Sequence, residues 1–399
     1  MRVGAIVLGC ALLGGTGCTW STSKPPSQPS PKPTAQKPTT PKTQPRAQAR
    51  PPANPFVQVA SRFQHSCARR KAGDVLCWGK NTYGQLGNGG RIDSPRLSKV
   101  RGLTGAKQVE VGRDFSCALR TNGGVMCWGN NEDGQLGDGR GGSPGAMSLD
   151  VAGVRGLKGI KQISLGEYHG CALSSDGKVK CWGNAGNGQI SDDSQRVFAS
   201  PMTIDRLGPI KQIASGGNHV CALERSGKVK CWGRNTEGQL GDGKSGSRIK
   251  AVEVQGIRDG VALISGDNHS CAVRKNGTVW CWGSNSDGQL GLKGTGKKHN
   301  TPVPMDGLAQ VAQIAGGDRH GCARLKTGRV ACWGSNDQGQ TGGPISGGRL
   351  KPGAVRGVGD AVDISLGKGH SCAVRTGGQI TCWGSNEHAA LGPHRLAQR

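Results

Sequence analysis

The chain has 399 residues, of which 70 are glycine and 16 are cysteine, and its formal net charge is +26. Length alone is compatible with two or three domains. Glycine is far above its usual share of about 7% and has no three-residue period, which excludes collagen and disfavours an ordinary helical domain. The positive charge indicates an anionic partner or simple solubility. The cysteines indicate metal or redox chemistry in the cytosol, or disulfides in an exported protein.

The first 17 residues have the pattern of a secretory signal peptide. A short apolar run, Val3–Leu13, leads through the small residues Gly14–Gly17 to Cys18, and it is too short to cross a membrane as a helix. Cysteine after small residues resembles a bacterial lipobox, although Gly15 stands where such boxes usually carry leucine. We therefore expect export and a lipid anchor on Cys18 in the bacterial cell envelope. Ordinary signal cleavage and secretion is the alternative.

Residues 18–55 are expected to form an extended tether. Its positions 24–55 hold 11 of the chain's 20 prolines, six basic residues and no acidic one. Such a segment cannot bury a core and favours extended polyproline II structure. It is interpreted as a solvated spacer, with binding to anionic lipid or wall polymer as the alternative.

The remaining chain, residues 56–399, contains seven repeats of about 50 residues. Cys-Trp-Gly occurs once in each, and another cysteine lies ten residues before the cysteine of that motif. In the third repeat, apolar alternation and glycine-containing turns predict strands at 160–165, 169–173 and 178–182, followed by an outer strand. Four short strands per repeat are typical of a β-propeller blade. We predict an all-β, seven-bladed propeller with one four-stranded repeat per blade.

The spacing of the two cysteines in each repeat predicts a disulfide. Every repeat has glycine six residues after the first cysteine, for example Gly73. Glycine there suits the left-handed end of a three-residue hairpin loop. The two cysteines then lie opposite each other within bonding range. The alternatives are buried free thiols and a zinc site that includes the histidine two residues earlier. The predicted pairs are Cys67–Cys77, Cys117–Cys127, Cys171–Cys181, Cys221–Cys231, Cys271–Cys281, Cys322–Cys332 and Cys372–Cys382.

The tryptophan of each Cys-Trp-Gly motif is predicted to be structural. It follows the second cysteine directly, so it points to the opposite face of the strand, toward the other neighbouring blade. A ligand-binding aromatic surface is the alternative. The histidine two residues before the first cysteine is also interpreted as structural, because the second repeat has Phe115 there. The tryptophans are Trp78, Trp128, Trp182, Trp232, Trp282, Trp333 and Trp383.

The repeat unit, best seen in His269–Gly291, resembles the regulator of chromosome condensation repeat. The resemblance covers nearly all of residues 56–399 and implies a seven-bladed propeller. The eukaryotic founder of the family is a nuclear exchange factor for a small GTPase. We do not expect that activity in an exported chain, which also has no long blade insertion. A secreted bacterial relative that inhibits β-lactamase implies that the architecture can serve as a protein-binding module outside the cell.

Residues that differ between repeats are the candidates for individual function. Basic residues follow the glycine-rich turn in each unit, and they are expected to form a basic face, or else a solvated mixed surface. No unrepeated cluster of histidines and carboxylates is visible along the chain, and no cofactor or metal is predicted. The basic residues are Arg91, Arg140, Arg196, Lys244, Lys293, Lys297, Lys298, Arg349 and Arg395.

We therefore expect a membrane-tethered, extracytoplasmic and monomeric propeller that binds a protein or an anionic envelope polymer without catalysis. The first alternative is a hydrolase or lyase that uses the propeller channel, which requires an unrepeated polar cluster at the channel mouth. The second is exchange-factor activity, implied by the resemblance and disfavoured by the export signal. Nucleic acid is disfavoured because no aromatic stacking platform is evident.

Overall fold

The computed structural model describes residues 54–190, 196–292, 296, 298–393 and 395–396. The predicted signal peptide (1–17), Cys18, nearly all of the tether, Lys293 and Lys297 lie outside the described residues. Within the described residues, no helix is both long and apolar enough to cross a membrane.

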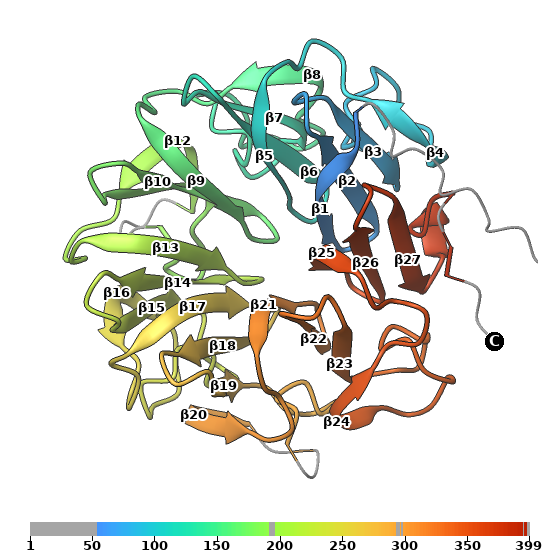
Figure 1. Ribbon diagram of the computed structural model, residues 1–399. Coiled ribbons are helices and arrows are strands. Elements are labelled where there is room, and N and C mark those ends of the chain that lie inside the picture. Colours follow the sequence, from blue (N-terminus) through green and yellow to red (C-terminus); the bar gives the residue numbers. More distant parts are fainter. Residues whose placement is uncertain (1–53, 191–195, 293–295, 297, 394, 397–399) are drawn as a thin grey trace, which may run out of the picture. The chain divides into compact units, whose positions relative to one another are not determined.

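Seven antiparallel sheets are arranged in a ring around a central channel (Figure 1). In each sheet the strands pair in chain order, from the innermost strand at the channel to the outermost strand at the rim. Each sheet is built from one sequence repeat, so the prediction of an all-β, seven-bladed propeller is confirmed.

The innermost strands are β1 (Phe56–Arg62), β5 (Ala106–Val111), β9 (Ile160–Leu165), β13 (Ile210–Ser215), β17 (Gly260–Ser265), β21 (Val311–Gly316) and β25 (Ala361–Leu366). The second strands are β2 (His65–Arg70), β6 (Phe115–Arg120), β10 (His169–Ser174), β14 (His219–Glu224), β18 (His269–Arg274), β22 (His320–Leu325) and β26 (His370–Arg375). The third strands are β3 (Val75–Gly79), β7 (Val125–Asn130), β11 (Val179–Asn184), β15 (Val229–Gly233), β19 (Val279–Gly283), β23 (Val330–Gly334) and β27 (Ile380–Gly384). The outermost strands are β4 (Ser94–Lys99), β8 (Met147–Gly153), β12 (Val197–Thr203), β16 (Arg248–Glu253), β20 (His299–Met305) and β24 (Arg349–Ala354).

Strand direction divides the propeller into two faces. The turns after the innermost strands, such as 63–64, and the long loops after the third strands, such as 80–93, lie on one face, which we call the loop face. The hairpins between second and third strands, such as 71–74, lie on the other, which we call the hairpin face. Both kinds of loop-face segment meet at the ion pair between Lys80 and Asp114, whose atoms are 3.0 Å apart.

The hairpin between the second and third strands has the predicted geometry. Gly73 and its counterparts all have positive φ; Gly73 itself is at 91°, in the region that only glycine adopts freely. The two cysteines lie directly opposite each other in the register, as Cys171 and Cys181 do. All seven predicted pairs are joined as disulfides in the structure.

Each tryptophan and each disulfide lie on opposite sides of their blade, as side-chain alternation predicts. Trp128 packs in one buried cluster with Cys67 and Cys77 of the preceding blade. Its indole nitrogen donates to the backbone carbonyl of Gln85, 2.8 Å away. All seven tryptophan side chains are fully buried. The core is therefore a set of seven similar layers between blades, rather than one central cluster.

The seventh blade departs from the predicted four strands. It contains β25, β26 and β27, and among the described residues its fourth position holds only an isolated parallel bridge between Cys382 and Arg395. The chain reaches this point after a short 3-10 segment, η1 (Glu387–Ala389), and runs parallel to β27 instead of returning antiparallel as the outer strands of the other blades do.

Where the ring closes, the described strands of the first and seventh blades stay in their own sheets. Trp78 packs in a cluster with Cys372 and Cys382, and the Val59 N–H donates to the Asp363 carboxylate at 2.8 Å. β1 lies directly beside β25 (Figure 1). The first and seventh blades therefore pack against each other through the same kind of tryptophan–disulfide layer as the other neighbouring blades.

Candidate functional site at the channel mouth

One residue from each blade surrounds the mouth of the channel on the loop face. Each lies four residues before the first cysteine of its repeat, in the turn after the innermost strand. The framework around them is repeated, but their side chains differ in size and charge from blade to blade. These mouth residues are Phe63, Arg113, Glu167, Gly217, Asp267, Asp318 and Lys368.

Backbone hydrogen bonds between blades hold this mouth in place. The N–H groups of Arg113, Glu167 and Gly217 each donate to a carbonyl of the next blade, at 3.2, 3.0 and 3.0 Å. The Lys368 N–H donates to the Phe63 carbonyl at 3.0 Å and closes the ring between the last and first blades. The varied side chains therefore project from a fixed frame.

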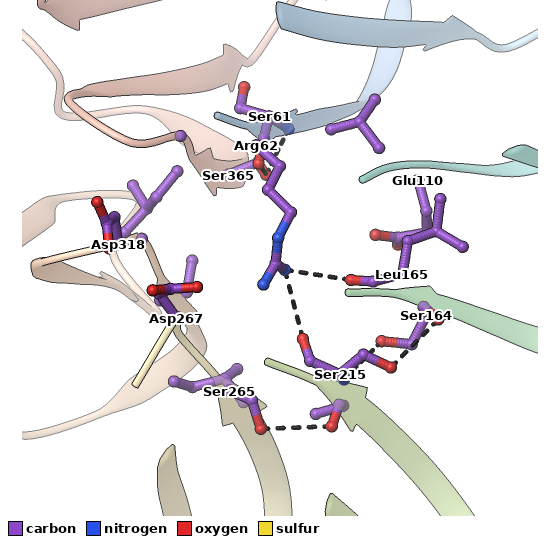
Figure 2. Close-up of a pocket in the computed structure, with 18 of the residues that line it drawn as sticks. Ser61, Arg62, Glu110, Ser164, Leu165, Ser215, Ser265, Asp267, Asp318 and Ser365 are labelled. Carbon is purple, nitrogen blue, oxygen red and sulfur yellow. Dashed lines mark hydrogen bonds between the residues drawn. The ribbon is translucent and has the colours of Figure 1, made fainter. Parts of the chain in front are cut away.

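Arg62 reaches into the channel below the mouth. Its guanidinium donates to the backbone carbonyls of Leu165, at 3.1 Å, and Ser215, at 3.4 Å (Figure 2). These carbonyls belong to the third and fourth blades, so the side chain crosses the channel. The space around it is a cavity of about 320 Å³, lined by residues of all seven innermost strands.

The first blade can place an arginine there because it departs from the repeat. The other six blades have glycine five residues before the first cysteine. At Gly166, for example, a Cβ atom would come within 2.0 Å of the His169 ring. In the first blade β1 extends through Arg62, and Phe63 turns the chain with a φ of 51°.

Carboxyl groups from the third, fifth and sixth blades lie at the mouth, and one from the second blade lies across the channel from Asp267 and Asp318. Asp267 and Asp318 lie close together in Figure 2, and burial raises the pKa of both. Burial also raises the pKa of Glu167, reinforced by the charge of Asp267. Deeper in the channel, burial raises the pKa of Glu110 to about 7. The structure thus brings Asp267 and Asp318, carboxyl groups from separate repeats, together at the mouth, a pairing that no local sequence pattern shows.

The opposite side of the mouth is basic and aromatic. The Arg113 guanidinium lies over the Phe63 ring, 4.1 Å from its centre, and the Lys368 ammonium lies 5.2 Å from the same centre. Lys368 is exposed, whereas Phe63 and Arg113 are half-buried. Around the ring, the mouth residues of blades seven, one and two are basic or aromatic, and those of blades three, five and six are acidic. The mouth is therefore divided by charge.

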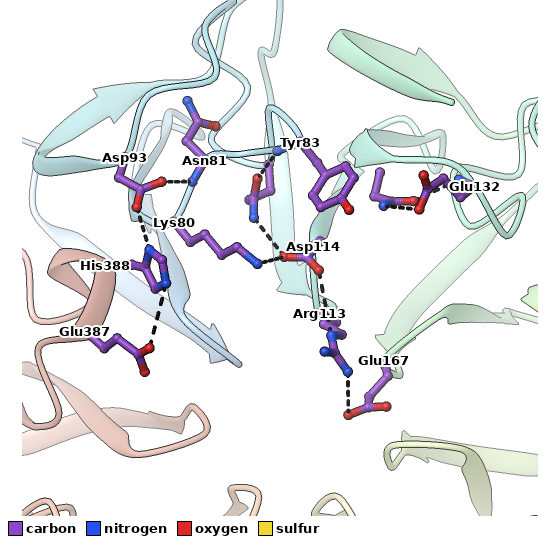
Figure 3. A network of polar contacts seen from close by, with 12 residues as sticks. Lys80, Asn81, Tyr83, Asp93, Arg113, Asp114, Glu132, Glu167, Glu387 and His388 are labelled. Carbon is purple, nitrogen blue, oxygen red and sulfur yellow. Dashed lines mark hydrogen bonds and ion pairs between the residues drawn. The ribbon is translucent and has the colours of Figure 1, made fainter. Parts of the chain in front are cut away.

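A chain of polar contacts connects this mouth to the outer loops (Figure 3). Lys80 contacts Asp114, which lies 3.8 Å from Arg113, and Arg113 lies 4.0 Å from Glu167. At the rim of the same face, His388 Nδ1 lies 2.6 Å from the Asp93 carboxylate. The two pairs of Arg113 orient its side chain more than they stabilise the fold, because partly exposed ion pairs contribute little.

The predicted basic residues are divided between the loop face and other places. Five of them are exposed and lie in or beside the long loops: Arg91, Arg140, Arg196, Lys244 and Lys298. Arg349 is the first residue of β24. Arg395 does not lie in such a loop but beside the middle of β27. The ring of basic residues is thus interrupted at the seventh blade.

The histidines two residues before the first cysteines are buried between blades. His65 shares a hydrogen bond of 2.9 Å with the Ser116 hydroxyl of the next blade, while His169 has no hydrogen-bond partner for either ring nitrogen. Burial lowers the pKa of these histidines, to about 3 for His65 and His169 and about 4 for His269. No group of three or more histidine, cysteine or acidic side chains within the described part of the chain is arranged to hold a metal ion.

Sequence reasoning missed the mouth residues although a signal was present. Glu167, Asp267 and Asp318 are separated by 51 residues or more, so no local motif connects them. Their constant distance of four residues before a repeated cysteine is the signal. A position that varies within an otherwise repeated unit, on the innermost turn, predicts a cluster at the channel mouth.

The fold and this site define a disulfide-containing, seven-bladed β-propeller with a charge-divided mouth. The chain belongs to the RCC1-like domain family, which matches residues 148–398. Regulator of chromosome condensation (RCC1) repeats also match residues 56–85, 106–135 and 72–119. The resemblance inferred from the repeat unit is confirmed.

The chain is similar to known proteins over different extents. The mitochondrial RCC1 domain-containing protein RUG3 of Arabidopsis thaliana is 29% identical over 160 residues, which cover 37% of this chain and 35% of the relative. The match thus spans about a third of that relative's length.

Two solved structures share the fold over most of the chain. Human WBSCR16 has a TM-score of 0.74 at 23% identity and covers 81% of this chain and 87% of its own. Prp20p of Saccharomyces cerevisiae, described with its binding to Gsp1p and histones, has a TM-score of 0.71 at 22% identity, covering 86% and 83%. At these identities the similarity shows the fold alone.

Proposed function

We propose that this protein is a lipid-anchored, extracytoplasmic propeller that binds a partner protein through the channel mouth on its loop face, without catalysis. The observation that carries the proposal is the variation of the seven mouth residues on a repeated, hydrogen-bonded frame. Structural roles explain the repeated cysteines, tryptophans and histidines, but not this variation. Binding of proteins by Prp20p, a structure of the same fold, supports the same class of function.

The division of charge at the mouth favours a protein over an anionic envelope polymer. Lys368 and Arg113 would attract a polyanion, but Glu167, Asp267 and Asp318 would repel it. A protein surface can present both charges in a matching arrangement, which gives specificity. A polymer that bound only the outer basic residues would leave the mouth without a role.

The start of the described chain lies away from the mouth. The described chain begins on the hairpin face, where Asn54 Nδ2 donates to the Asp74 carboxylate at 3.1 Å. There the Lys71 N–H also donates to the Pro55 carbonyl at 2.9 Å. The first described residues therefore lie on the face opposite the mouth.

A hydrolase or lyase is the second candidate, because Asp267 and Asp318 have raised pKa values beside a cavity. Such carboxyl groups suit proton transfer. The Arg62 side chain crosses the channel near them, which disfavours passage of a substrate. Turnover of an envelope substrate that disappears in Asp267→Asn would establish this candidate. Exchange-factor activity requires cytoplasmic, unprocessed protein, and cell fractionation tests that requirement.

Site-specific photocrosslinking tests the proposed function. A photoreactive residue is placed at exposed Lys368 on the loop face, or at exposed Lys275 on the hairpin face as a matched control. In cells that naturally contain the chain, we expect a discrete protein adduct from position 368 and none from position 275. An adduct only from position 275, or from neither, contradicts the proposal.

A further inference from the structure

At six of the seven junctions between blades, a glutamine side chain occupies a small polar space beside the loop face. These glutamines are almost completely buried. Gln289, for example, accepts a hydrogen bond from the Asp287 N–H at 2.9 Å and donates to the Ser284 hydroxyl at 3.2 Å. Gln85 donates to the Asp114 carboxylate of the next blade at 3.1 Å. The six glutamines are Gln85, Gln135, Gln189, Gln239, Gln289 and Gln340.

The seventh blade lacks this side chain. Ala390 stands in the place of the glutamine, and its carbonyl still accepts from the Trp78 indole at 2.9 Å. Gly369 adds to the loss of volume, because every other blade has a larger residue at that position. A cavity of about 460 Å³ lies here, and its lining includes Gln64, Gln338, Gly369, Ser385 and Ala390. We call it the seventh-blade cavity.

Partners suited to an amide remain in this cavity. Ser385 is the counterpart of Ser284, and Gln64 is the counterpart of Asp114 in the next blade. Among the described residues, the side chains of Gln64 and Gln338 make no hydrogen bond, and the Ser385 hydroxyl accepts one from the Glu387 N–H at 3.3 Å. Amide and hydroxyl groups can both donate and accept, so they match another amide.

The charges around the cavity favour a neutral group. Arg319 and Lys368 are balanced by Asp337 and Glu387 among the lining residues. A carboxylate or an ammonium group would be attracted by one pair and repelled by the other. A primary amide offers a donor and an acceptor without a net charge.

We propose that the seventh-blade cavity binds a glutamine side chain from a loop of the partner protein. The amide would take the place that Gln85 and its counterparts occupy in the other blades. The inference rests on the proposed function, because it assumes a protein partner. It adds a second binding site beside the mouth and names the partner side chain that would occupy it. The cavity shares Phe63 and Lys368 with the mouth, so one partner surface can reach both.

Three capped peptides added to the full chain test the inference. Acetyl-Gly-Gln-Gly-amide is compared with the corresponding alanine and glutamate peptides, and binding is followed by nuclear magnetic resonance shifts. We expect the glutamine peptide to bind about tenfold more tightly than the alanine peptide, through its buried hydrogen bonds. Equal binding of these two, or tighter binding of the glutamate peptide, overturns the inference.

A pair of neighbouring substitutions locates the binding. Ala390→Gln restores the side chain found in the other blades, so we expect it to fill the cavity, abolish peptide binding and raise the melting temperature. Ala389→Gly leaves the cavity open and should retain binding. Peptide binding that survives Ala390→Gln overturns the inference. The photocrosslink from position 368 is a separate readout, so a failed peptide test with a retained crosslink leaves the proposed function standing.

Discussion

Ala389 occupies a backbone position that the other repeats reserve for glycine. Its φ is 60°, close to the positive φ of its counterparts such as Gly288 at 77°. A left-handed conformation costs a residue with a Cβ about 1–2 kcal/mol. The sequence shows that the seventh repeat has alanine where the others have glycine. The energetic cost follows only from the structure, in which this residue has a positive φ similar to that of the glycines of the other turns.

Ala389→Gly is therefore predicted to stabilise the propeller by about 1 kcal/mol. The change relieves the left-handed alanine and is partly offset by the greater freedom of glycine in the unfolded chain. Denaturant unfolding measures the free energy of unfolding. The reverse change in another blade, Gly288→Ala, should destabilise by a similar amount. A lower stability of Ala389→Gly would refute the strain argument.

The buried histidines should make the propeller less stable in acid. Their pKa values in the folded protein, about 3 to 4, lie below the unfolded value of about 6.5. Between these limits the unfolded chain binds protons that the folded chain does not, so stability falls as pH falls from about 6.5 toward 4. Glu110, whose raised pKa acts in the opposite direction, offsets only part of this.

His169→Phe tests the effect at one position. Phenylalanine already occupies the equivalent place in the second blade, as Phe115, and His169 has no hydrogen bond to lose. We expect stability at pH 7 to be retained and the loss between pH 6.5 and 4 to shrink by about 1.4 kcal/mol per pH unit. Urea unfolding at several pH values measures this. An unchanged pH dependence would mean that His169 is not held neutral.

At the scale of strands and blades, most of the structure was predictable from the sequence. The ten-residue cysteine spacing and the glycine of Gly73 and its counterparts predicted the hairpin and its register, because both are local. Among the described residues of the seventh blade, the predicted outermost strand is represented only by the isolated bridge between Cys382 and Arg395.

Each disulfide is predicted to stabilise its hairpin by restricting the unfolded chain. Replacing Cys221 and Cys231 together by alanine should cost at most about 2.5–3 kcal/mol, the value for an eleven-residue loop. Peptide mapping of exported protein without reductant should recover all seven linked pairs. Free thiols at these positions, with no loss of stability in the double variant, would contradict this prediction.

At the scale of the whole molecule, the sequence predicted the number of blades but not the channel mouth. Glu167 and Asp267 lie 100 residues apart in the chain, yet both line the channel mouth because the blades are arranged in a ring. Arg62 likewise extends into the channel because the first blade has arginine where the other six blades have glycine. The predicted basic residues lie mostly in or beside the outer loops, whereas the residues that differ in charge on a repeated frame lie at the innermost turns.

The lipid anchor is a separate prediction about the whole protein. Cells expressing the chain and labelled with a palmitate analogue should incorporate the label, because lipoprotein processing would acylate Cys18. Cys18→Ala should abolish this label and release the protein from membranes. Undiminished labelling of the variant would show that Cys18 is not the site.

The affinity for the crosslinked partner, measured with purified proteins, tests the central claim most directly. The comparison is between the unaltered chain, Lys368→Glu at the mouth and Lys275→Glu on the hairpin face, two reversals of an exposed charge. Lys368→Glu places a negative charge on the basic side of the mouth and should weaken binding about tenfold or more, since like charges at an interface are costly. Lys275→Glu should leave the affinity unchanged. Equal affinities for the two variants, or a loss confined to Lys275→Glu, would contradict binding through the channel mouth.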